Sequence, residues 1–98
     1  MGESVLAQIE NALNRYRERT TTIKRLGFLR GTLYQSMSGN GYLQWWLRAD
    51  GKKMYVRNRD VRSVKAALHR GQRLQEFEDE MIGSISIAIR RNQRKPNN

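Results

Sequence analysis

The stretch FLRGTLYQSMSGNGYLQWWLRADGKKMYVR, residues 28–57, decides the fold of this chain. Apolar and polar residues alternate along it, which is the period of a β-strand whose two faces meet different surroundings. Two turn sequences, Ser-Gly-Asn-Gly at 38–41 and Asp-Gly at 50–51, interrupt the alternation with residues that adopt positive φ readily. They separate three strands, near 28–37, 42–49 and 52–57. Because the connections are short, we expect an antiparallel three-stranded meander.

A helix is expected on the N-terminal side of the strands. Apolar residues recur every three or four positions through residues 4–26, which indicates an amphipathic helix, and Gly27 is a typical stop. Three consecutive threonines, 20–22, favour a bend or fraying, because β-branched side chains lose rotamer freedom in a helix.

A second, longer helix is expected after the strands. Asn58 can cap it, with Asp60 in its first turn, and the helical period continues to the basic residues before Pro96. Gly71 and Gly83 are positions where such a helix could kink. The fold class is therefore predicted to be α+β, with an N-terminal helix, a three-stranded antiparallel meander and a long C-terminal helix.

The 98 residues are enough for one core and not for two. We predict a single α+β domain over residues 1–92 and a basic disordered tail over 93–98. The long helix exceeds what a small sheet can cover, so its distal half is expected to pack on the first helix. A homo-oligomer is expected through residues that remain on this distal half, around Met81, Ile82, Ile85 and Ile89.

Composition excludes several classes of protein. The chain has no cysteine, so disulfides and thiolate metal sites are impossible and a cytoplasmic location is the default expectation. No stretch approaches the roughly 18 apolar residues of a membrane span, and the N-terminal residues lack the pattern of a signal peptide. We therefore expect neither a membrane partner nor export.

The net charge of +10 is unevenly placed along the sequence. Residues 11–75 hold fifteen of the nineteen Lys and Arg residues but only three acids, whereas four of the nine acids fall within 76–80. Such segregation is typical of a positive surface that faces a polyanion, with nucleic acid as the expected partner. A solubilising surface is the alternative explanation.

Alternation also assigns the strand residues to two unlike faces. One face is nearly all apolar, and the other combines aromatic with cationic side chains, which suit bases or sugars and phosphates respectively. With nearby basic residues, the predicted nucleic-acid-binding residues are Arg30, Tyr34, Tyr42, Trp46, Arg48, Lys53, Tyr55, Arg57, Arg59 and Arg62. Of the adjacent Trp45 and Trp46, the alternation places one in the core and one outside, and we predict that Trp46 is outside.

Two other interpretations of this aromatic face stay open. Cross-strand aromatic pairs also stabilise sheets, and the stems of Arg and Lys commonly cover them. The face could equally bind another protein, so the alternative function is an oligomerising protein–protein adaptor. DNA is slightly preferred over RNA as the nucleic acid.

Catalysis finds little support in the sequence. His69 is the only histidine, with no cysteine to share a metal, and the acids of 76–80 follow no metal-loop pattern. The glycine-rich turn at 38–41 lacks the lysine and the following helix of a phosphate-binding loop. We expect no enzymatic activity, no catalytic residues, no metal and no cofactor.

The order of features over about 9–89 resembles an uncharacterised microbial family known as a domain of unknown function. The matching motifs are Gly-Thr-Leu at 31–33, Gly-Tyr-Leu at 41–43 and Asp-Gly-Lys at 50–52. This chain lacks the cysteines and the His-Gly-Pro sequence of that family. The resemblance implies the same layout of elements and no settled activity. Because the family occurs in microbial genomes and mobile elements, it suggests an accessory or regulatory factor of a mobile element or phage.

Overall fold

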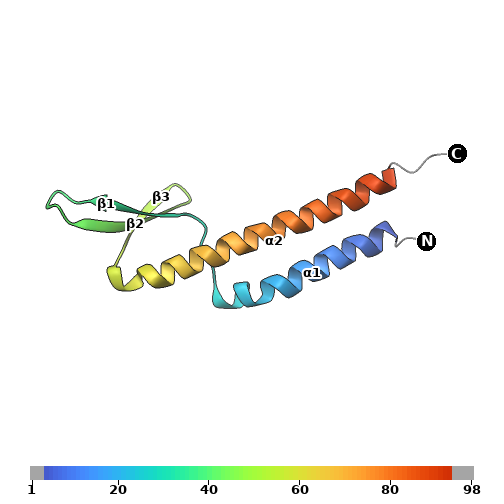
Figure 1. The fold of residues 1–98 in the computed structure, drawn as a ribbon, viewed down its shortest axis with the longest axis horizontal. Helices are drawn as coiled ribbons and strands as arrows, with labels where there is room; N and C mark the ends of the chain where they lie inside the picture. Colours follow the sequence, from blue (N-terminus) through green and yellow to red (C-terminus); the bar gives the residue numbers. More distant parts are fainter. Residues whose placement is uncertain (1–3, 94–98) are drawn as a thin grey trace. The chain divides into compact units, whose positions relative to one another are not determined.

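The computed structural model describes residues 4–93 and has the predicted order of elements (Figure 1). The elements are α1 (Val5–Leu26), β1 (Thr32–Met37), β2 (Leu43–Ala49), β3 (Lys52–Val56), the 3-10 turn η1 (Asn58–Asp60) and α2 (Val61–Gln93). The α+β fold class is therefore confirmed. Gln93 ends α2, and the rest of the predicted basic tail, 94–98, lies outside the described residues.

The chain divides into two compact units, which we describe separately. The sheet unit is Leu26–Arg73 and holds the three strands with the first part of α2. The helical unit is Met1–Arg25 with Leu74–Asn98, and its described residues belong to α1 and to the second part of α2.

In the sheet unit, β2 lies between β1 and β3 and is antiparallel to both, as the short turns predict. Asp50 and Gly51 have φ values of 52° and 73° and form a two-residue turn between β2 and β3. Positive φ at both central residues matches the right-handed twist of the two strands, which is why Asp-Gly is favoured there. This turn pairs Ala49 with Lys52 and so sets the register along β2 and β3.

The segment between α1 and β1 runs across α2 instead of extending the first strand. The Leu29 backbone N–H donates to the Ala67 carbonyl at 3.0 Å, and Arg70 Nε donates to the Gly27 carbonyl at 2.6 Å. A side chain at buried Gly71 would collide with the backbone carbonyl of Leu29. The first strand therefore begins at Thr32 and not near residue 28, because the backbone donor of Leu29 is already used by α2.

The apolar face of the sheet is covered only in part. Leu47 and Val56 are buried at 3% and 7% exposure, and together with Val64 of α2 they line a groove on this side. Met37 and Leu43, which are cross-strand partners, remain 67% and 58% exposed. The predicted division into faces agrees with the register, but the start of α2 is too narrow to bury every apolar residue.

In the helical unit, α1 and the second part of α2 lie side by side and antiparallel (Figure 1). Their seam buries small and apolar residues, namely Ala12, Thr20, Ile23, Leu74 and Ala88. The α2 residues that line cavities against α1 include a series at alternating spacings of four and three, the spacing of a coiled-coil seam, namely Phe77, Met81, Ser84, Ala88 and Arg91. A cavity of about 10 Å³ beside the seam is too small for a ligand.

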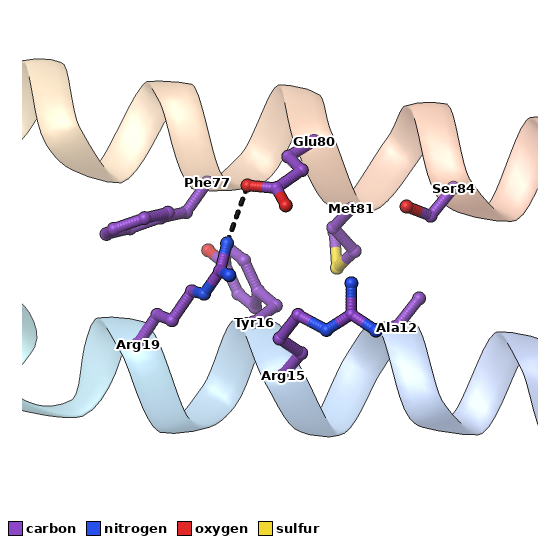
Figure 2. Close-up of a pocket in the computed structure, with 8 residues that line it drawn as sticks. All are labelled: Ala12, Arg15, Tyr16, Arg19, Phe77, Glu80, Met81 and Ser84. Atoms are coloured by element: carbon purple, nitrogen blue, oxygen red, sulfur yellow. Dashed lines mark hydrogen bonds and ion pairs between the residues drawn. The ribbon is translucent and has the colours of Figure 1, made fainter.

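Side chains from both helices close over this seam (Figure 2). Arg19 reaches from α1 to Glu80 of α2, with 2.6 Å between Nη1 and Oε2, and its guanidinium lies 5.4 Å from the centroid of the Phe77 ring. The Met81 side chain points from α2 toward α1. Met81 therefore faces α1 of the same chain, whereas it was predicted to take part in contacts between copies.

Of the bend or fraying predicted at the threonines, fraying does not occur. The α1 helix continues through residues 20–22, where the hydroxyls of Thr20 and Thr21 donate to the carbonyls of Tyr16 and Arg17. The predicted cap of the second helix was wrong. Asn58 does not cap α2 directly, since η1 comes first and the Asp60 N–H donates to the Arg57 carbonyl.

The α2 helix is unbroken over 33 residues, so neither glycine divides it.

Candidate nucleic-acid interface

The face of the sheet opposite α2 carries its residues in cross-strand rows. The middle row is aromatic and consists of Tyr34, Trp46 and Tyr55, one from each strand. The adjacent row is Thr32, Arg48 and Lys53. Because residues directly paired across strands point to the same side, these six side chains share one face. The register thus brings together five of the ten predicted binding residues.

The cations of this face rest on its aromatic rings. The Arg48 guanidinium carbon lies 5.4 Å from the centroid of the Tyr34 ring, and Lys53 Nζ lies 5.0 Å from that of Trp46. Both distances are within the range where a cation is attracted to the face of an aromatic ring. We call Tyr34, Trp46, Arg48, Lys53 and Tyr55 the braced face, because each of the two charges is held in place by a ring.

The aromatic row is itself packed. The Trp46 and Tyr55 rings are 5.7 Å apart at 71°, an edge-to-face arrangement. Tyr34 and Trp46 are half-buried, whereas Tyr55 is 54% exposed and both Arg48 and Lys53 are exposed. The rings of Tyr34 and Trp46 are thus largely covered by their neighbours and by the cations, while Tyr55 and the charged groups face outward.

The two tryptophans point to opposite sides of the sheet, as their adjacency predicts. Trp45 pairs with Val56 and lies on the apolar face, where the Lys65 ammonium of α2 is 4.9 Å from its ring. Trp46 lies on the braced face. Both are half-buried, so the sequence distinguished their sides correctly but overstated the difference in exposure. The contact between Lys65 and Trp45 was not predicted, since no local pattern connects residues twenty positions apart.

The other five predicted binding residues lie outside the three strands. Arg30 precedes β1, with its guanidinium 5.7 Å from the Phe28 ring. Tyr42 precedes β2 and is 72% exposed. The remaining three are exposed residues that follow β3, namely Arg57, Arg59 in η1 and Arg62 in α2. Thr32, in the row of Arg48 and Lys53, was expected on this face but was not chosen as a binding residue.

Charge is concentrated in the unit that carries the braced face. The sheet unit contains ten Lys and Arg residues against two acids, Asp50 and Asp60, a net charge of +8. The helical unit contains nine against seven, a net charge of +2. Polyanions are therefore attracted mainly to the sheet unit.

Comparisons with protein-family models, curated proteins and solved structures found no match to this chain. The resemblance to a domain of unknown function therefore stays a prediction. Within residues 4–93, no group of three or more His, Asp or Glu side chains is placed to hold a metal ion. No helix in this part of the chain is both long enough and apolar enough to cross a membrane.

Proposed function

We propose that this chain is a non-enzymatic nucleic-acid-binding protein that holds DNA against the braced face of its sheet. The observation that carries the proposal is the pair of outward cations, Arg48 and Lys53, each fixed over an aromatic ring on the face that α2 leaves open. Fixed cations suit phosphate contacts, because less side-chain freedom is lost when they bind. The net charge of +8 on the sheet unit adds long-range attraction.

The ring geometry favours duplex DNA over single strands. A single-strand site needs aromatic faces on which bases stack. Here the cations lie over Tyr34 and Trp46, and Trp46 meets Tyr55 edge-on. Of the three rings only Tyr55 is more than half exposed, so phosphate contact by the two cations is the main interaction that this face offers. Phosphate contacts are available on DNA and on RNA duplexes alike, so the preference for DNA stays a prediction of the sequence.

A salt titration of binding tests this proposal. Affinity for a labelled DNA duplex would be measured by fluorescence anisotropy at several salt concentrations for wild type, Arg48→Ala and Lys53→Ala. Each phosphate contact contributes about 0.9 to the slope of log affinity against log salt, so each variant should lower the slope by about that amount. Arg17→Ala is the matched control, since it removes the same charge from an exposed helical position in the other unit and should leave the slope unchanged.

A second pair of variants tests whether the aromatic rings support the cations or stack on bases. Tyr34→Leu and Trp46→Leu keep both cations but remove the rings beneath them. Loss of an exposed cation–π contact costs about 0.5–1 kcal/mol, a twofold to fivefold loss of affinity, whereas loss of a base-stacking ring costs about 1–3 kcal/mol. Bracing predicts the smaller loss, equal on duplex and single strand. A larger loss confined to single strands would show that the rings stack bases.

The proposal fails if wild type binds neither DNA nor RNA at low salt. It also fails if Arg17→Ala lowers the slope as much as Arg48→Ala does, because binding would then reflect overall charge and not the braced face. Circular dichroism would first establish that each variant is folded.

One observation favours the adaptor as a second candidate. Met37 and Leu43 form an exposed apolar pair at the end of the sheet, on the face that α2 only partly covers. Exposed apolar side chains of this kind occur at protein interfaces. If the adaptor is correct, Met37→Ser with Leu43→Ser should abolish capture of one defined protein partner that persists after nuclease treatment. The nucleic-acid proposal predicts that this double variant binds DNA as wild type does.

That the protein is an accessory or regulatory factor of a mobile element or phage stays a prediction.

A further inference from the structure

The helical unit has two unlike sides flanking its seam. On one side, polar and charged residues of α1, including Asn11 and Arg15, line an open groove with Ile87 and Arg91 of α2. The ion pair between Arg19 and Glu80 lies beside the seam on this same side, next to Arg15. This side is therefore polar and positively charged overall.

The other side of the seam is apolar on both helices. Successive helical residues rotate by about 100°, so residues three and four apart form a stripe. On α1 the stripe that turns away from the polar side is Leu6, Ile9 and Leu13. On α2 it is Ile82, Ile85 and Ile89. Because the helices are antiparallel and each stripe is rotated away from the polar groove, the two stripes adjoin. We call these six residues the apolar face.

The most exposed members of this face are large aliphatic side chains. Leu6, Ile82 and Ile89 are 66%, 55% and 42% exposed, and the other three are half-buried. The six residues occupy 6–13 of α1 and 82–89 of α2, each stretch about 12 Å long, and the two helices together are about 20 Å wide. At about 240 Å² in projection, the apolar face forms the centre of an interface, and the polar residues around it supply the rest of the roughly 800 Å² that each partner buries in a stable complex.

We propose that the apolar face is the surface through which two copies of this chain associate. Charge selects this occupant. Two sheet units, each at +8, repel one another, whereas two helical units carry only +2 each and meet through a face whose six residues are apolar and which Glu10 and Arg17 border with opposite charges. A single apolar face that pairs with itself gives an isologous two-fold dimer, and two antiparallel helix pairs then form a four-helix bundle. The self-association does not depend on nucleic acid.

The test compares two isoleucines of the same helix. Ile82→Glu places a carboxylate on the apolar face, and Ile87→Glu places the same group on the polar side at a similar exposure of 49%. Sedimentation equilibrium of the full chain should give twice the 11.5 kDa chain mass for wild type and for Ile87→Glu. Ile82→Glu should be monomeric, with dimerisation weakened at least about 100-fold, because burying an unpaired charge is costly.

Leu6→Glu provides an independent measurement from α1, at the most exposed position of the face. If Ile82→Glu loses its helical circular dichroism, a folded and monomeric Leu6→Glu still supports the proposal. A wild type that is monomeric at its highest soluble concentration overturns it, and so does a folded Leu6→Glu that remains dimeric. Equal loss of dimer in Ile82→Glu and Ile87→Glu would also overturn it, because association would then not be specific to one face.

Discussion

The two units of this chain differ in net charge, +8 for the sheet unit and +2 for the helical unit, and in what their cations contact. The sheet unit has ten cations and two acids, and it holds Arg48, Lys53 and Lys65 over aromatic rings. The helical unit has nearly balanced charges. Arg19 and Lys24 lie over rings there too, but Arg19 also forms an ion pair with Glu80 across the seam. A ring holds a cation without cancelling its charge, whereas a carboxylate cancels it.

This difference explains why we assign different partners to the two units. Cations braced by rings keep their full charge for an external anion, which suits nucleic acid. The seven acids of the helical unit offset most of its nine cations, and the low net charge allows an exposed apolar face to meet a second copy with little repulsion. One chain thus combines a surface for a polyanion with a surface for itself.

The largest expected effect would show whether the two units are also separate in stability. Leu47→Ala in β2 and Ile23→Ala in α1 each remove a buried aliphatic side chain, which costs about 2–5 kcal/mol. Both tryptophans belong to the sheet unit, so their fluorescence reports its unfolding, while far-ultraviolet circular dichroism is dominated by the helices. In thermal unfolding, Leu47→Ala should lower mainly the fluorescence transition and Ile23→Ala mainly the dichroism transition.

If each variant instead lowers both transitions equally, the chain unfolds as one cooperative unit. The two units would then be distinct in structure but would not unfold independently of each other.

A smaller effect is expected from glycines in the two parts of α2. Gly71→Ala introduces a methyl group that collides with the Leu29 carbonyl, so the free energy of unfolding should fall by about 1–3 kcal/mol. Gly83→Ala meets no atom within 4 Å and should gain up to about 1 kcal/mol from better helix propensity. Urea denaturation of both variants measures this. Equal stabilisation by the two substitutions would mean that residues 27–30 do not pack on α2 as described.

The smallest effect concerns the ion pair of the helical unit. The side chains of Arg19 and Glu80 are 41% and 49% exposed, so solvent screens their attraction. A double-mutant cycle of Arg19→Ala and Glu80→Ala should give a coupling energy of about 0.5 kcal/mol that shrinks as salt is added. A coupling of several kcal/mol would show that charge, and not the apolar seam, holds the two helices together.

Much of the fold follows from local sequence alone. The alternation in residues 32–37 and 43–49 was sufficient to predict which side chains share a face, because a strand has a side-chain period of two in any surroundings. Asp50-Gly51 predicted the turn between β2 and β3, since few residue pairs adopt positive φ twice in succession. The same reasoning placed Tyr34, Trp46 and Tyr55 together before any tertiary contact was known.

Tertiary structure decided how deeply these residues are covered and what they touch. The sequence predicts only that Gly71 weakens the helix. In the structure, the absence of a side chain at Gly71 lets the Leu29 carbonyl pack directly against α2. Met37 and Leu43 read as core residues yet remain exposed, because one helix cannot cover the whole sheet. Likewise Met81 faces α1 while Ile82 stays open. A local sequence pattern specifies which way a side chain points from its backbone. Its burial depends on which distant helix or strand packs against that side, and this is determined only when the whole chain folds.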